Sequence, residues 1–176
     1  MTKHPAMLGF VAYSGTGKTT LLEQLIPKLT SHNIRIGLIK HAHHNFDIDI
    51  PGKDSYRLRK AGAQQVLVAS NTRQARIIEN PMPNKEPSLK ESLAGLQTST
   101  LDLILVEGFK HEDYPKVEIN RSDHPQPLIY PNDKNIIAFV SDVEQDLPEE
   151  ITSLSLGNLD EITDFVRQYV KNSITG

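Results

Sequence analysis

The sequence predicts an α/β fold, in which helices cover both faces of a mostly parallel β-sheet. Short apolar runs that are typical of buried strands recur along the chain. Several of them are followed by stretches with apolar residues at helical spacing, so that strands and helices alternate. The first run passes through a turn of small residues directly into such a helical stretch.

Composition indicates a soluble globular protein of ordinary domain size. The chain has 176 residues, of which 38% are hydrophobic and 23% charged, and a formal net charge of −3. Without a long basic run, this charge argues against general electrostatic binding to nucleic acid. The absence of cysteine excludes disulfides and thiolate metal sites. No segment approaches the roughly 20 apolar residues that cross a bilayer, so we expect a single cytoplasmic domain over residues 1–176.

Residues 8–20, LGFVAYSGTGKTT, have the layout of a phosphate-binding P-loop: a strand, a glycine-rich turn, a Lys, a hydroxyl and a helix. Gly15 and Gly17 let the backbone curl so that its N–H groups face inward, and the helix that follows adds unpaired N–H groups. Lys18 can then reach the β- and γ-phosphates of a nucleotide, while the hydroxyl of Thr19 can ligate Mg²⁺.

One position departs from the full P-loop pattern, because Ala12 stands where a Gly is expected. Ala is the smallest replacement, so we expect the turn to survive; the alternative is an ordinary turn between a strand and a helix. We therefore predict a three-layer P-loop NTPase, with nucleotide contacts from Ser14, Gly15, Thr16, Gly17, Lys18, Thr19 and Thr20.

Helices are predicted from apolar spacing and from capping residues. The first continues from the P-loop to about residue 31, and a second is expected over 54–63. Ser88 and Glu91 resemble a capping box that opens a short helix, SLKESLAGL. The last helix is expected from about Leu159, with a cap formed by Asn158 and Glu161.

Strands and loops follow from apolar runs and from turn residues. Buried strands are expected at 34–40 and 136–140, a short strand at 66–69 and the most apolar strand at 101–106. A less buried strand is expected at 73–79, and an edge strand at 117–119. The polar stretch 41–52 is expected to be a loop, and proline-rich stretches predict irregular loops at about 80–87 and 122–133.

Ligands of such a sheet bind at the carboxyl ends of the strands. Glu107 follows the most apolar run, LDLILV, and we expect it to support Mg²⁺ opposite the P-loop; the alternative is a polar residue that merely closes a strand. Asp142 follows the strand at 136–140, where a nucleotide base would lie. Its carboxylate could accept the N1–H and N2–H₂ donors of guanine, which adenine lacks, although the usual N-K-x-D form is missing.

The loop after the second strand contributes two further groups. Asp47 and Asp49 are candidates to ligate Mg²⁺ or to orient an attacking water, as switch segments do in GTPases; the alternative is two solvated loop acids. The imidazoles of His41, His43 and His44 could bind a transition metal, contact phosphates or another anionic ligand, or lie on the surface.

Three stretches together resemble the MobB family of molybdopterin-guanine dinucleotide biosynthesis proteins: SGTGKTTLLEQLIP, GLIKHAHHNFDIDIPGKDSYRLRKAGA and LDLILVEGFKHE. The resemblance covers most of residues 8–111 and, more weakly, 138–143. Many proteins share the P-loop, whereas the combination of KHxHHxxDxDxPGKDS with LVEGFK is much more specific.

The resemblance implies a GTP-binding adapter with weak GTPase activity in molybdenum cofactor biosynthesis. Its cofactors would be GTP and Mg²⁺, with Thr19 and Glu107 at the metal and Lys18, Asp47, Asp49 and Glu107 serving hydrolysis. The implied partners are molybdopterin or its dinucleotide, the guanylyltransferase and other proteins of that biosynthesis, and a second copy in a homodimer.

Two other functions stay open from the residues alone. A P-loop kinase could phosphorylate a small metabolite held by residues 53–60 and the His cluster, although no arginine-bearing lid is recognisable. A nickel-insertion GTPase is the second alternative, and only the His cluster favours it.

Overall fold

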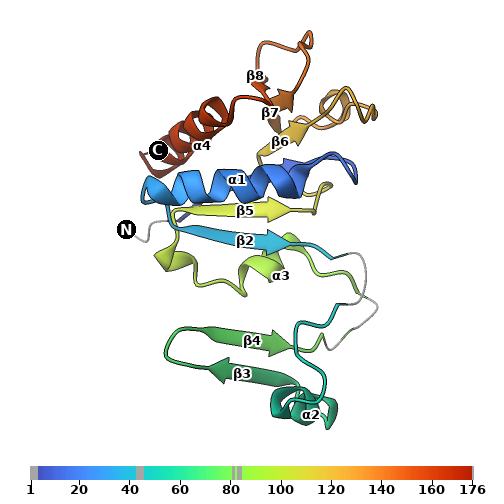
Figure 1. Ribbon diagram of the computed structural model, residues 1–176, viewed down its shortest axis with the longest axis vertical. Coiled ribbons are helices and arrows are strands. Elements are labelled where there is room, and N and C mark those ends of the chain that lie inside the picture. The colour runs from blue at the N-terminus through green and yellow to red at the C-terminus, as the bar shows by residue number, and fades with distance from the viewer. Residues whose placement is uncertain (1–3, 43–45, 81, 83–84, 176) are drawn as a thin grey trace. The chain divides into compact units, whose positions relative to one another are not determined.

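The computed structural model describes residues 4–42, 46–80, 82 and 85–175, and the chain forms two compact units (Figure 1). The sheet unit comprises Met1–His41 and Ser88–Gly176, and the hairpin unit comprises Ala42–Pro87. The single domain expected from the sequence stays a prediction, because compactness does not show whether a unit folds independently.

The sheet unit is built on six strands that are parallel throughout, in the order β2-β5-β1-β6-β7-β8. The strands are β1 (Ala6–Val11), β2 (Ile36–Lys40), β5 (Leu103–Glu107), β6 (Lys116–Ile119), β7 (Ile136–Ser141) and β8 (Thr152–Ser155). The sequence did not indicate β8, because its residues TSLS contain one buried apolar side chain, Leu154, and no apolar run.

Helices cover both faces of this sheet, which confirms the predicted three-layer α/β fold (Figure 1). On one face α1 (Lys18–Ser31) and α4 (Leu159–Thr175) pack their apolar sides against β1, β5, β6 and β7. On the other face lie α3 (Leu89–Leu93) and short 3-10 turns at Thr98–Thr100 and Tyr130–Asn132. No helix within the described residues has the length and apolar character needed to span a membrane.

Strand β5 is apolar at successive positions because it is covered on both faces. Leu103 and Leu105 belong to the core beneath α1 and α4, whereas Ile104 and Val106 belong to the core beneath α3. Successive side chains of a strand point to opposite faces, so a strand covered on both sides must be apolar at each residue. All four of these side chains are buried.

The predicted helix caps are present, with one change of partner. At α3, Ser88 Oγ accepts from the Glu91 N–H, and Glu91 accepts from the Ser88 N–H, so the capping box is complete. At α4, Asn158 Oδ1 accepts from the Glu161 N–H at 3.2 Å. The Glu161 carboxylate accepts from the Ser155 N–H in β8 instead of completing a box. This side chain therefore links helix α4 to the last strand.

The prediction that residues 117–119 form an edge strand is wrong, because β6 lies between β1 and β7. The strand contains two charged residues, Lys116 and Glu118, and both are buried and paired. Lys116 contacts Asp133 at 2.8 Å, and Glu118 accepts from the backbone N–H groups of Ile129 and Tyr130. The irregular segment after β6 thus covers the polar side of this strand, and burial raises the pKa of Glu118.

The hairpin unit contains α2 (Asp54–Lys60), β3 (Gln65–Ala69) and β4 (Gln74–Ile78). The two strands pair with each other in antiparallel fashion and form a separate two-stranded sheet. Both predicted strands therefore exist, but neither extends the central sheet. Most of their side chains are exposed, including Leu67 and Ile78.

Gly9 in the middle of β1 should not tolerate a side chain. A Cβ there would lie 2.5 Å from Tyr114 Cε2, and Tyr114 is 2% exposed. Gly9→Ala should therefore lower the free energy of unfolding by about 1–3 kcal/mol through overpacking, measured by urea denaturation. In the control Gly157→Ala, the added Cβ would lie 3.8 Å from Ser155 Oγ, an ordinary contact. Equal effects of the two substitutions would contradict this explanation.

Candidate functional site

The turn between β1 and α1 has the backbone geometry of a phosphate cradle. Gly15 and Gly17 have φ angles of +83° and +90°, a region in which a side chain is strained. Thr16 is buried between them, and its hydroxyl donates to the carbonyl of Tyr13 at 2.9 Å. This hydrogen bond closes the turn, so the predicted curl of the P-loop forms although Ala12 replaces the expected Gly.

A hollow of about 370 Å³ lies inside this turn. The first turn of α1, all of which the structure describes, contains no acidic residue, and Gly17 at its N-cap offers no side-chain acceptor. The N–H groups of the helix end therefore favour an external anion, and the residues fit a phosphate group. The hollow is lined by Tyr13, Ser14, Gly15, Thr16, Gly17, Lys18, Thr19, Thr20 and Glu107.

Glu107 at the end of β5 lies between two lysines. Lys18 Nζ is 3.9 Å from Glu107 Oε1, and Lys40 Nζ is 3.4 Å from Glu107 Oε2. The carboxylate is 15% exposed, so these charges compensate a largely buried anion. Sequence reasoning missed Lys40, whose position follows from the strand register, because Lys40 of β2 is the direct partner of Glu107.

The backbone after Glu107 is shaped by close packing. Gly108 has a φ angle of +94°, and a Cβ on it would lie 2.6 Å from His41 Cβ. The hydroxyl of Tyr114 donates to the Gly108 carbonyl at 2.8 Å, and the His41 N–H donates to the Glu107 carbonyl at 2.8 Å. A glycine at position 108 thus lets the chain turn closely against His41, the residue after β2, while Glu107 stays beside Lys18.

Of the three histidines in the loop after β2, the structure describes His41. The ring of His41 stacks on that of Phe109, with centroids 4.4 Å apart. His43 and His44 lie outside the described residues. Among the residues that the structure does describe, no group of three or more His, Asp or Glu side chains is arranged to hold a metal ion.

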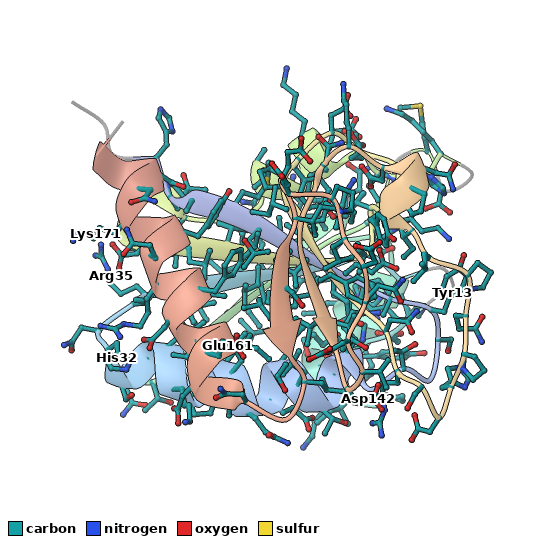
Figure 2. All side chains as sticks on the ribbon, turned by 90° about the horizontal axis from the view of Figure 1, so that it is seen from above. Tyr13, His32, Arg35, Asp142, Glu161 and Lys171 are labelled. Atoms are coloured by element: carbon teal, nitrogen blue, oxygen red, sulfur yellow. The ribbon has the colours of Figure 1, made fainter. Side chains whose placement is uncertain are left out.

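Asp142 follows β7 at the carboxyl edge of the sheet, as predicted, but its oxygens already have partners. Oδ1 accepts from the Ser122 N–H and Oδ2 accepts from the Ser122 hydroxyl, both at 2.8 Å. These hydrogen bonds lower the pKa of Asp142. Figure 2 shows Tyr13 and Asp142 at one end of the sheet unit, with His32 and Arg35 at the other. Asp142 therefore lies at the same end as the P-loop.

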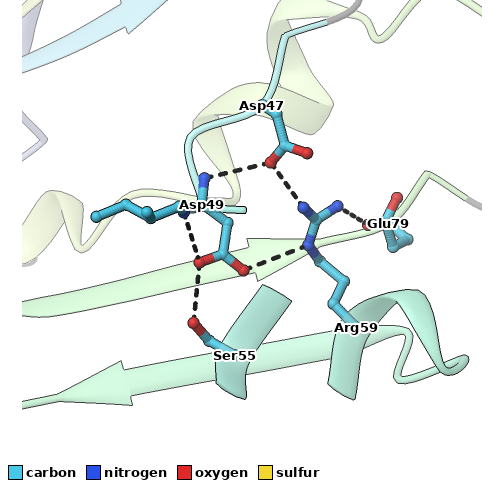
Figure 3. Close-up of polar contacts among 6 residues, drawn as sticks. Asp47, Asp49, Ser55, Arg59 and Glu79 are labelled. Carbon is cyan, nitrogen blue, oxygen red and sulfur yellow. Dashed lines mark hydrogen bonds and ion pairs between the residues drawn. The ribbon is translucent and has the colours of Figure 1, made fainter. Parts of the chain in front are cut away.

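The carboxylates of Asp47 and Asp49 both lie beside the guanidinium of Arg59, within the hairpin unit (Figure 3). Asp47 Oδ1 and Glu79 Oε1 each lie 2.6 Å from a terminal nitrogen of Arg59, and Asp49 Oδ2 is 3.7 Å from its Nε. The hydroxyl of Ser55 donates to Asp49 Oδ1 at 2.9 Å. The Arg59 side chain is 7% exposed, so these acids compensate a buried cation. A role of Asp47 and Asp49 at a metal or a water stays a prediction.

The family model described as molybdopterin guanine dinucleotide synthesis protein B matches residues 7–142. The chain belongs to the MobB family. It is 46% identical over 168 residues to the molybdopterin-guanine dinucleotide biosynthesis adapter protein of Escherichia coli (strain K12), covering 94% of this chain and 93% of that protein. The adapter protein of the same name from Haemophilus influenzae is 40% identical over 172 residues, covering 97% and 92% of the two chains.

Solved MobB structures share this fold. The MobB homologue from Bacillus stearothermophilus aligns with a TM-score of 0.68 at 25% identity, over 94% of this chain and 98% of that chain. A further crystal structure, of molybdopterin-guanine biosynthesis protein B, aligns with a TM-score of 0.71 at 22% identity, over 94% of this chain and 99% of that one. The family model and the two adapter proteins confirm the family expected from sequence motifs, and these structures show the same fold.

The Arg59 cluster of this MobB chain should make the hairpin unit sensitive to acid. The hydrogen bond from Arg59 lowers the pKa of Asp47 below its ordinary 3.8. The resulting stability is present above pH 3.8 and is lost as the pH falls through the lower, folded-state pKa. Asp47→Asn should therefore reduce hydrogen-exchange protection of β3 and β4 near neutral pH, and this difference from the native chain should shrink in acid.

A matched control for this prediction is Asp54→Asn in the same unit. The Asp54 side chain is 92% exposed, and it pairs only at 3.8 Å with Arg57. Its replacement should leave the protection of β3 and β4 unchanged. If Asp47→Asn also left protection unchanged at neutral pH, the cluster would not hold the hairpin unit together.

Proposed function

We propose that this protein is a GTP-binding adapter of molybdopterin-guanine dinucleotide biosynthesis that hydrolyses GTP slowly. The observation that carries the proposal is the hollow in the P-loop, where Lys18 and the N-terminus of α1 face Glu107. Phosphates would bind to the backbone N–H groups of the turn and to the Lys18 ammonium. The nucleotide contacts would come from Ser14, Gly15, Thr16, Gly17, Lys18, Thr19 and Thr20.

Magnesium would be held by Thr19 and Glu107 together with the phosphates. The hydroxyl of Thr19 is in the first turn of α1, and Glu107 lines the same hollow. Two oxygen ligands suit Mg²⁺, which usually keeps several waters and binds through substrate phosphates. The ion would neutralise phosphate charge, and Lys40 would remain as the compensating partner of Glu107.

Slow hydrolysis is supported by the charge arrangement around Glu107. Among the described residues that line the hollow, Glu107 is the only carboxylate, and two lysines lie beside it. Because this carboxylate is paired with both lysines, the described lining of the hollow offers no unpaired carboxylate to act as a general base on an attacking water. Asp47 and Asp49 are the remaining candidates to serve metal or water.

The adapter role is supported by relatives that carry this name and match the chain over nearly its whole length. Its partners would be molybdopterin or its dinucleotide, the guanylyltransferase that makes the dinucleotide, and other proteins of molybdenum cofactor biosynthesis in the cytoplasm. We further propose that it acts as a homodimer.

Lys18→Ala should strongly weaken GTP binding while the fold is retained. Loss of a charge-assisted contact to phosphate costs about 1.5–3 kcal/mol, so the dissociation constant measured by calorimetry with Mg²⁺ should rise roughly 10- to 100-fold or beyond detection. The control Lys28→Ala changes the last turn of the same helix, where Lys28 contacts Asp160. Unchanged GTP affinity of the Lys18 variant would overturn the proposed site.

Asp142→Asn should weaken GTP binding roughly 10-fold or more and improve XTP binding, if its carboxylate reads guanine. Ser122→Ala is the matched control, because it removes only the hydroxyl that donates to Asp142 Oδ2. If Asp142 binds the guanine base, the Ser122→Ala protein should bind GTP as tightly as the native protein or more tightly. If both variants instead lost GTP and XTP equally, Asp142 would serve to anchor Ser122 rather than to select the base.

A further inference from the structure

The segment after β6 places two side chains directly against the glycines of the P-loop. Arg121 Nη1 lies 3.4 Å from the position that a Cβ on Gly17 would occupy, and His124 Nε2 lies 3.4 Å from the corresponding position on Gly15. The His124 ring nitrogen is also 3.0 Å from the carbonyl oxygen of Ser14. Residues 121–124 therefore lie next to the cradle, although they are far from it in the sequence.

This segment is held in place from several sides. The Ser122 N–H and hydroxyl both donate to Asp142, and the His124 N–H donates to the Arg121 carbonyl at 3.2 Å. Just before it, the Asn120 N–H donates to the Val140 carbonyl at 3.0 Å, which ties the segment to β7. The backbone of Arg121 is thus fixed beside the P-loop by the ends of two strands.

The guanidinium of Arg121 is oriented by Asp123. Nε and Nη2 of Arg121 donate to the two carboxylate oxygens of Asp123 at 2.9 and 2.8 Å. One edge of the planar guanidinium, Nε and Nη2, thus binds Asp123, and the remaining nitrogen, Nη1, lies toward Gly17. The Arg121 side chain is 39% exposed, so it can reach a ligand without leaving a buried position.

We propose that Arg121 is a phosphate-binding residue, whose Nη1–H donates to a phosphate oxygen of the nucleotide held by the P-loop. The inference rests on the proposed nucleotide binding and adds a second cation to Lys18, supplied by the same chain. Arginine suits this role because it is always charged and presents several donors in one plane. Asp123 aims the side chain and balances its charge before the ligand binds.

The test compares Arg121→Ala with Arg167→Ala. Arg167 also pairs with an aspartate, Asp164, and has a similar exposure of 43%, but it lies on α4. Binding of GTP with Mg²⁺ is measured by calorimetry, and binding of inorganic tripolyphosphate by competition with a fluorescent GTP analogue. Arg121→Ala should weaken both ligands by roughly 10-fold, because a charge-assisted hydrogen bond is lost. Arg167→Ala should change neither.

Asp123→Asn separates phosphate binding from a merely structural role. The Asn side chain keeps one oxygen that can accept from Arg121, so Arg121 stays oriented, while the negative charge beside the phosphates is removed. GTP affinity should therefore equal the native value or be tighter. If Arg121 only braced the segment, loss of its Asp123 partner would weaken binding instead, and that result would overturn the proposal. Native GTP affinity in Arg121→Ala, or a loss for GTP without a loss for tripolyphosphate, would also overturn it.

Failure of this inference is distinguishable from failure of the proposed function. If the native chain binds neither GTP nor tripolyphosphate, or if Lys18→Ala binds as the native chain does, the nucleotide site itself is wrong. If Lys18→Ala loses binding while Arg121→Ala retains it, the nucleotide site stands and only the role of Arg121 is wrong.

Discussion

The arrangement of this protein depends on the parallel register around β1. Because β1 lies between β5 and β6 and all three run in the same direction, their carboxyl ends meet at one edge. The P-loop follows β1, Glu107 ends β5, and Arg121 follows β6 shortly after. An antiparallel neighbour would carry its corresponding residue to the opposite edge. Direction of the strands, rather than distance along the chain, therefore assembles the site.

Charge compensation is the second constraint at this edge. Glu107 is largely buried between Lys18 and Lys40, so two cations compensate its charge before any ligand binds. An anionic ligand can therefore recruit Lys18 without leaving Glu107 unpaired. Similar compensation occurs at Lys116 with Asp133 and at Arg59 with its three acids. In each case ionised side chains are retained away from water because a partner is close.

The site was predictable from sequence where its chemistry depends on neighbours in the chain. The P-loop is one continuous segment, and the turn closes through Thr16 and Tyr13, three residues apart. The position of Glu107 beside the P-loop was also predictable, since a carboxylate directly after an aliphatic run is conspicuous. Lys40 and Arg121 were missed, because an exposed lysine at a strand end and an arginine in an irregular segment resemble ordinary surface residues. Only the register and the packing of residues 121–124 bring them to the cradle.

The sequence by itself determined the α/β class, the P-loop, the strand that presents Glu107, and the family, because each depends on local periodicity or on contiguous motifs. The tertiary structure decided that β6 is internal, that β3 and β4 form their own sheet, and which partners Asp142, Asp47 and Asp49 have. These features are pairings between segments that are separated along the chain. A charged strand such as β6 can be buried only if other segments supply its partners, and a one-dimensional pattern does not specify those partners.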